Sequence, residues 1–157
     1  MVEIVEPALV HAHGPPGHLA PGPEAPYVLQ GSFFEEVIMS SHEVAKSFTE
    51  LCRSGKMDEA ARKFWSDDVV SIEPMTGDMA RLQGRKAVEG KGKWWTDNHD
   101  VHGVKVDGPF VNGDEFTVRF ELDVTPKGKA RMTMTEIALY KVKDGKVVEE
   151  KFFSGGA

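Results

Sequence analysis

The apolar residues of this chain change their spacing near residue 100. Before that point they recur every three or four positions, as on the buried face of a helix. Beyond it they alternate with polar residues, as in a strand with one buried face. Helical segments followed by a meander of strands are typical of an α+β fold, with three helices packed on one face of a curved antiparallel or mixed sheet. A length of 157 residues suits one such domain.

The first helix has a clear start signal. Ser40 and Glu43 have the spacing of a capping box, and the helix is predicted to run from there to Gly55. A second, shorter helix is predicted over residues 57–64, and Trp65 is expected to close it.

A strand and a third helix are predicted next. The strand covers residues 69–73 and ends at Glu73, because Pro74 restricts the preceding residue to an extended backbone. The helix is expected from about Arg85 towards residue 97. Residues 84–93 lack the spacing of a phosphate-binding loop, so their charges predict a solvated helix face.

The rest of the chain is predicted to form antiparallel strands. The alternation starts at Val101, and turn residues interrupt it at 107–109, 112–114 and 125–129. Strands are expected to include residues 104–106, 116–124, 131–142 and 147–153. Residues 143–146, Lys-Asp-Gly-Lys, give a strong signal for a two-residue hairpin.

Residues 1–39 differ in composition from the rest and are expected to form a mobile extension, whereas residues 40–157 form the domain. The extension holds six of the nine prolines and no Lys or Arg. Its histidines, His11, His13 and His18, are not accompanied by carboxylates or thiols at fixed spacing, so disorder is favoured over a metal site.

Composition excludes several classes of function. The formal net charge is −6, and no basic stripe is present, so we expect no nucleic-acid partner. Cys52 is the only cysteine, which rules out an internal disulfide. No apolar run has transmembrane length, and the N-terminus lacks a secretory signal, so we expect a cytoplasmic protein without a membrane partner. No spacing of ligands predicts a metal, and no motif predicts a cofactor.

Three stretches carry a family resemblance. Residues 65–68 give an aromatic, a small residue and an Asp pair, residues 69–72 form a strand, and Glu73-Pro74 follows. Together with residues 82–88 and 140–153, this order resembles the nuclear transport factor 2-like superfamily, particularly its SnoaL-like and ketosteroid-isomerase-like members. The resemblance implies a cystatin-like cone that binds a small hydrophobic ligand. It also implies that Glu73 occupies the position of the proton-abstracting carboxylate.

The sequence departs from the isomerases at both oxyanion-stabilising positions. Phe48 stands where they have a tyrosine, and Ala138 stands where they have a protonated acid. Glu136, two residues before Ala138, points to the same side and could substitute. Removing one such donor costs about 3 kcal/mol of transition-state stabilisation, so steroid isomerisation is disfavoured.

The candidate catalytic residues are Glu73, Glu136, Tyr140 and His99. A dry interior would raise the pKa of a carboxyl group towards neutrality and make it a general base. Each candidate also has a structural interpretation. Glu73 could be solvated or paired with Arg81 or Arg85, and Glu136 could be satisfied by a hydrogen bond to Tyr140 or a backbone amide. Tyr140 could be an amphipathic wall residue, and His99 could be a surface histidine.

Apolar side chains on the same elements could line a cavity for a flat hydrophobic ligand, or they could form an ordinary core. The candidates are Phe48, Trp65, Trp95, Phe116, Val118, Phe120, Met134 and Ala138.

The opposite face of the sheet is polar. Its charged residues and threonines can form cross-strand ion pairs within one chain, and the resemblance implies a homodimer through this face. They are Arg119, Glu121, Asp123, Arg131, Thr133 and Thr135.

The sequence thus favours a cofactor-independent enzyme that transfers a proton on a small carbonyl or cyclic compound, with Glu73 as base. The alternative is a binding protein that holds a hydrophobic metabolite in the same cavity without chemistry. An interaction domain acting through its sheet is a third interpretation.

Overall fold

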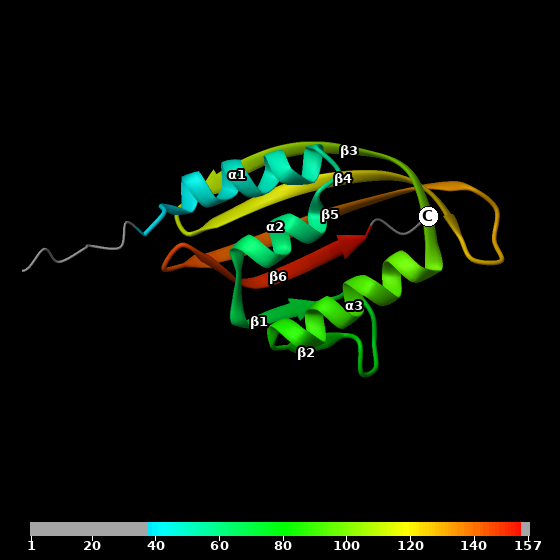
Figure 1. The fold of residues 1–157 in the computed structure, drawn as a ribbon, viewed down its shortest axis with the longest axis horizontal. Coiled ribbons are helices and arrows are strands. Elements are labelled where there is room, and N and C mark those ends of the chain that lie inside the picture. Colours follow the sequence, from blue (N-terminus) through cyan, green and yellow to red (C-terminus); the bar gives the residue numbers. More distant parts are fainter. Residues whose placement is uncertain (1–37, 155–157) are drawn as a thin grey trace, which may run out of the picture. The chain divides into compact units, whose positions relative to one another are not determined.

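The computed structural model describes residues 38–154, and the predictions for residues 1–37 lie outside it. Its elements follow the chain in the order α1 (Ser41–Arg53), α2 (Met57–Phe64), β1 (Trp65–Ile72), β2 (Arg81–Gln83), α3 (Arg85–Asn98), β3 (His99–Asn112), β4 (Glu115–Pro126), β5 (Met132–Lys143) and β6 (Lys146–Ser154) (Figure 1). Within the described residues, every helix is too short or too polar to cross a membrane.

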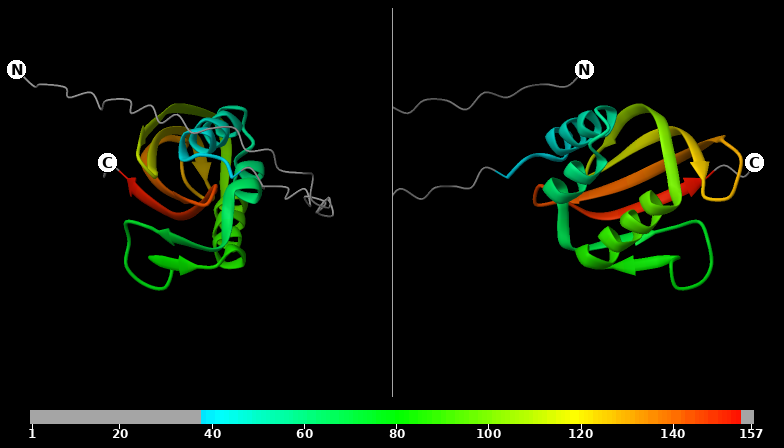
Figure 2. Two further views of the ribbon diagram at one scale, coloured as in Figure 1. Left: turned by 90° about the vertical axis from the view of Figure 1, so that its left-hand side faces the viewer. Right: turned by 45° about the vertical axis from the view of Figure 1, so that its right-hand side comes forward.

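The six strands form one mixed sheet in the order β2-β1-β6-β5-β4-β3. β1 and β6 are parallel, and all other neighbours are antiparallel. The long strands curve, and the three helices lie on the same side of the sheet (Figure 2). We call this covered side the inner face. The α+β prediction, with three helices on a curved mixed sheet, is confirmed.

The helices cover the inner face because their apolar sides face it. The Ser40 and Glu43 capping box is present, and the Glu43 carboxylate accepts from the Ser40 amide at 2.8 Å. α1 packs on β3, β4 and β5, and α3 packs on β1, β2 and β3. Along β4 every second residue from Phe116 to Val124 is buried, as the alternation predicted.

α2 ends as predicted, with Trp65 as its C-cap, but two strand predictions near β1 are wrong. β1 already begins at Trp65, whose backbone is extended, rather than at residue 69. Residues 81–83, for which no strand was predicted, form the short strand β2, which pairs with β1. A three-residue edge strand is too short to leave a period in the sequence.

The turn predicted at residues 107–109 is also wrong, because β3 continues through it. The pairing of β3 with β4 shifts register between Asp107 and Phe110, so the segment forms an irregularity within a strand. β3 is an edge strand, and an edge tolerates Pro109 because no second neighbour needs its missing amide hydrogen.

The hairpin predicted at residues 143–146 is confirmed. Asp144 and Gly145 both have positive φ, 50° and 72°, as a two-residue turn of the favoured type requires. Immediately beyond it the pairing of β5 with β6 shifts by one residue, between Lys141 and Val142. This shift determines which face each later residue of β6 occupies.

Candidate functional site

Four neighbouring strands place one row of side chains on the inner face. Ser71 of β1 pairs with Glu150 of β6, Glu150 pairs with Tyr140 of β5, and Tyr140 pairs with Phe116 of β4. Paired residues of adjacent strands point to the same side of a sheet. All four are buried. The row therefore combines a hydroxyl, a carboxyl and a phenol with an aromatic ring in the interior.

Glu73 lies at one end of this group of polar side chains. It follows β1, and its backbone amide donates to the Ala80 carbonyl oxygen at 2.9 Å. Its carboxylate Oε1 lies 2.6 Å from Lys91 Nζ, and 19% of its side chain is exposed. Glu73 is thus neither bathed in solvent nor paired with Arg81 or Arg85. Its partner is a lysine that the sequence analysis did not select.

Lys91 reaches the inner face from α3. Its Nζ donates to Ser71 Oγ at 2.6 Å, to Glu73 Oε1 at 2.6 Å and to Glu150 Oε1 at 3.2 Å. The ammonium also lies 4.5 Å from the centre of the Phe152 ring, within the range of a cation–π contact. Only 14% of the Lys91 side chain is exposed.

The prediction of a solvated face for residues 84–93 is therefore wrong for two of its cations. Lys91 is enclosed, and the Arg85 guanidinium bonds to Asp67 at 3.2 Å and also to the Trp65 carbonyl oxygen. The helical period contained the signal for Lys91. It follows the buried Val88 by three residues and precedes the half-buried Trp95 by four, so all three share one side of α3.

Glu136 has a different environment from Glu73. It lies on the inner face of β5, opposite Phe120 of β4, and no hydrogen bond affects its pKa. Burial, and then the neighbouring charge of Glu73, raise the pKa of Glu136 to about 7, against an opposing effect of Lys91. A hydrogen bond to Tyr140, which the sequence offered as an alternative, is not among the influences on the Glu136 pKa. Glu136 is thus a shielded carboxyl group that changes its charge near neutral pH.

Glu150 is a third inner carboxyl, which the sequence analysis missed. Only 3% of its side chain is exposed. Burial raises its pKa, while the Lys91 ammonium opposes that rise. An unbroken hairpin from the 143–146 turn would place residue 149 opposite Tyr140. The register shift places Glu150 there instead, and no local sequence signal indicates that shift.

Tyr140 lies in an aromatic group with Phe48 and Phe116. Its ring centre is 4.7 Å from that of Phe48 and 4.9 Å from that of Phe116. Burial, followed by the nearby Glu150 charge, raises the pKa of Tyr140 well above its usual value. Tyr140 can therefore donate a hydrogen bond but keeps its proton at physiological pH.

The structure does not join His99 to the carboxyl groups. Its Nδ1 lies 2.8 Å from the Trp95 carbonyl oxygen, and its ring stacks on the Trp95 indole with centres 4.5 Å apart. Its catalytic role stays a prediction, supported by no contact with Glu73 or Glu136 among the described residues.

The predicted pocket residues all belong to the interior. Six are buried in the core and two, Trp95 and Met134, pack against it. Phe48 and Ala138, at the positions of the absent oxyanion donors, are both buried. This placement fits an aromatic cavity wall and an ordinary core equally, so a ligand-lining role stays a prediction.

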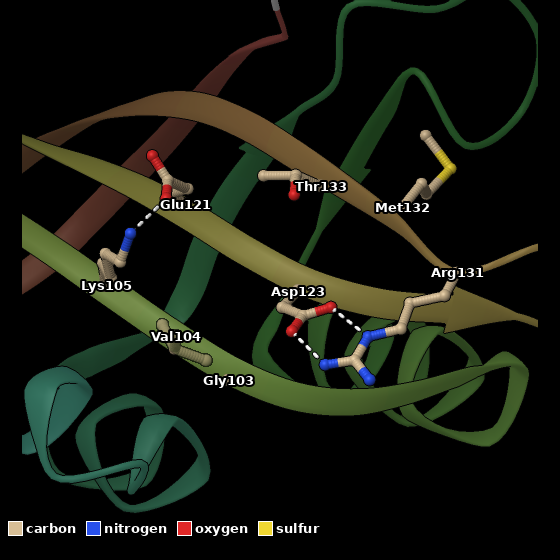
Figure 3. Close-up of a pocket in the computed structure, with 8 residues that line it drawn as sticks. All are labelled: Gly103, Val104, Lys105, Glu121, Asp123, Arg131, Met132 and Thr133. Atoms are coloured by element: carbon tan, nitrogen blue, oxygen red, sulfur yellow. Dashed lines mark hydrogen bonds and ion pairs between the residues drawn. The ribbon is translucent and has the colours of Figure 1, made fainter.

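Two hollows on the surface lie away from these residues. The first is on β3, β4 and β5, where Lys105 pairs with Glu121 at 2.7 Å and Arg131 donates to Asp123 at 2.8 Å (Figure 3). The cross-strand ion pairs predicted for the polar face are thus present. The second hollow lies at the start of α3, around Gly84.

The inner face can therefore hold and move protons. Glu73 and Glu150 contact a single ammonium group, that of Lys91, whereas Glu136 is near enough to be influenced by its charge without contacting it. Within residues 38–154, no three side chains of His, Cys, Asp or Glu converge closely enough to hold a metal ion.

Comparisons with known proteins extend this description. The model of the SnoaL-like domain family matches residues 39–154. A crystal structure from Mesorhizobium loti, described as a candidate SnoaL-like polyketide cyclase and carbohydrate phosphatase, is 50% identical. It matches 73% of this chain and 99% of its own, with a TM-score of 0.71. No curated protein matches the chain.

More distant structures share the fold. A protein of unknown function with a cystatin-like fold, from Xanthomonas campestris, is 20% identical over 75% of this chain and 92% of its own, with a TM-score of 0.62. A nuclear transport factor 2-like protein from Burkholderia xenovorans is 17% identical over 74% and 84% of the respective chains, with a TM-score of 0.56. The cystatin-like architecture expected from the sequence is confirmed.

Proposed function

The chain belongs to the SnoaL-like domain family of the nuclear transport factor 2-like superfamily, and on this basis we propose that it is a cofactor-independent isomerase or cyclase. Its substrate is a small hydrophobic carbonyl or cyclic compound, bound on the inner face of the sheet. Its catalytic groups are Glu73 as base and Glu136 as acid.

The contrast between these two carboxyl groups carries the proposal. Glu73 has the Lys91 ammonium 2.6 Å away, whereas burial and the charge of Glu73 raise the pKa of Glu136 to about 7. A carboxylate held by an ammonium group and a second, shielded carboxyl group that keeps its proton near neutral pH can serve as base and acid in one reaction. Glu136 also supplies a donor on the side of the sheet where Ala138 has none.

The reaction proceeds as a proton transfer that needs no other reagent. The Glu73 carboxylate removes a proton from the carbon beside the substrate carbonyl. The electron pair of the broken C–H bond forms a carbon–carbon double bond, and the π pair of the carbonyl group moves onto its oxygen. Protonated Glu136 donates a hydrogen bond or its proton to that oxygen. Glu73 then returns its proton to carbon, and Glu136 recovers its own from the enol.

Deuterium exchange tests the proposal without knowledge of the natural substrate. A flat cyclic ketone, 2-tetralone, has an acidic C–H beside its carbonyl, and its exchange in D2O can be followed by proton NMR. We expect the native protein to accelerate exchange over buffer. Glu73→Gln and Glu136→Gln should each lower the rate about 100-fold or more, because each removes a proton-transfer group.

The matched control is Glu89→Gln, on the exposed side of α3, which should keep the native rate. Exchange that survives in Glu73→Gln, or that is absent from the native protein, would contradict the proposed proton transfer.

A binding protein without chemistry is the second candidate. It is favoured by Phe48 and Ala138 at the donor positions, since neither side chain can stabilise an oxyanion. This function predicts that 2-tetralone raises the melting temperature of the native protein while its deuterium exchange stays at the buffer rate.

A further inference from the structure

We propose that Lys91 is the positioning residue of the inner site: its ammonium fixes Glu73 and Glu150, and it leaves Glu136 as the carboxyl group that carries the exchangeable proton. This inference rests on the proposed function, because it assigns roles within the same acid–base site.

The geometry of the contacts supports a positioning role. An ammonium group has three protons, and that of Lys91 has three oxygen partners. They belong to Ser71 on β1, Glu73 just after β1 and Glu150 on the adjacent β6, at 2.6, 2.6 and 3.2 Å. The Phe152 ring covers a further side of the ammonium group at 4.5 Å. These neighbours thus satisfy the hydrogen-bonding capacity of the Lys91 ammonium, and the Glu73 carboxylate is held in one place.

The count of charges supports the second half of the proposal. The inner face has three carboxyl groups and a single enclosed cation, so full ionisation would leave uncompensated negative charge in a shielded place. Glu73 and Glu150 contact the ammonium directly, whereas Glu136 does not. The proton that relieves the excess charge therefore resides on Glu136.

The charged and titratable groups that influence Glu136 come from the β1 end, α3 and β6, whereas β4 places the apolar Phe120 opposite it. They are Glu73 after β1, Lys91 on α3 and Glu150 on β6, and Tyr140 is on its own strand. Lys91 is the only one of them that lowers the pKa of Glu136. Removing the ammonium should thus make Glu136 hold its proton to higher pH.

Titration of the glutamate side chains tests this directly. The full-length protein, with glutamate carboxyl carbons labelled with 13C, is titrated by NMR as the native protein and as Lys91→Met. Loss of one buried positive charge should raise the Glu136 midpoint by about one pH unit or more. Lys91→Arg keeps the charge and should restore the midpoint to within about 0.3 unit of native, a difference smaller than the one-unit effect expected of the lost charge.

The matched control is Lys93→Met, on the same helix, where the side chain is 75% exposed and pairs only with Asp97. It should leave the Glu136 midpoint unchanged. A Glu136 midpoint that does not move in folded Lys91→Met would overturn the proposal.

If Lys91→Met does not fold, Lys91→Gln keeps a donor for Glu73 without the charge and should show the same upward shift. Unfolding of both variants beside a folded Lys91→Arg would overturn the proposal in favour of a purely structural role.

The outcomes separate this inference from the proposed function. An unmoved midpoint, together with loss of 2-tetralone exchange in Glu136→Gln, would leave the catalytic proposal intact and reject the role of Lys91. A Glu136 midpoint that is raised in Lys91→Met, together with no 2-tetralone exchange by the native protein, would support the role of Lys91 and reject the catalytic proposal.

Discussion

At the scale of single residues, the protein keeps ionisable groups where most domains place apolar ones. Glu73, Lys91 and Glu150 are held together by short contacts, which satisfies them. Among residues 38–154 Glu136 has no such contact, and keeping its proton avoids the cost of burying its negative charge. Buried charges are costly unless paired, so an unpaired carboxyl is expected at a site with a chemical role rather than in an ordinary core.

The raised pKa of Glu136 predicts a pH-dependent stability. Burial raises the pKa of folded Glu136 to about 7, whereas the unfolded carboxyl has its usual pKa of 4.5. Between these values the folded state binds more protons, so the free energy of unfolding falls as pH rises from about 5 to 8, by up to about 3 kcal/mol.

Urea unfolding at several pH values measures this slope, and Glu136→Gln should flatten it because the amide does not titrate. Glu89→Gln, at an exposed position, should keep the native slope. A slope that is the same in native protein and Glu136→Gln would show that other groups determine it.

At the scale of elements, the β5–β6 hairpin decides the composition of the site. Its turn residues have the positive φ angles that a two-residue turn requires, and the register shift beyond it turns Glu150 to the inner face. A one-residue difference in pairing moves a strand residue from one face to the other. The third inner carboxyl is thus a product of strand pairing.

The hairpin glycine can be tested against a second glycine with a similar backbone. Gly145 has φ +72°, and a Cβ added there would meet Ile38 and Met39 at 3.3 Å. Gly128 has φ +75° and open space around it. Gly128→Ala should lower the free energy of unfolding by about 1 kcal/mol, the cost of the left-handed backbone alone.

Gly145→Ala should cost more, by about 1 kcal/mol beyond that, because the added methyl group also crowds the chain before α1. Urea denaturation of both variants at one pH gives the comparison. Equal losses in the two variants would show that the contacts at 3.3 Å relax without cost.

At the scale of the whole domain, the two faces of the sheet differ in the residues that they carry. The inner face, covered by helices, holds the carboxyl groups and the aromatic residues. The outer face has paired charges, such as Arg119 with Asp107 at 3.0 Å. Amid these charges, Ile137 and Phe153 are cross-strand partners that remain 45% and 46% exposed.

We propose that this outer face joins two copies of the chain. An exposed apolar pair surrounded by charges of both signs can complement a second copy of itself across a two-fold axis. Sedimentation velocity should give twice the chain mass of 17.3 kDa. Ile137→Glu should shift the protein towards the single-chain mass, because it places charge in the centre of the contact.

Met75→Glu serves as the control, since Met75 is 55% exposed and lies in the loop between β1 and β2, outside the strands β5 and β6 that carry the exposed pair. Native protein that sediments as a single chain at high concentration would refute the dimer.

The sequence by itself determined the three helices, the long strands and the buried face of β4. Helical and two-residue periods, the Ser40 capping box and the Asp144-Gly145 turn depend on neighbours within a few positions, so local physics expresses them directly. The family motif likewise placed Glu73 at the end of β1.

Only the tertiary structure decided which charges meet. Lys91 and Glu73 are 18 positions apart, and Lys91 and Glu150 are 59 apart, so no local pattern predicts either contact. The orientation of α3 on the sheet and a one-residue shift beside the last hairpin bring these side chains together. Such contacts depend on how complete elements pack, and no single segment of the sequence contains that information.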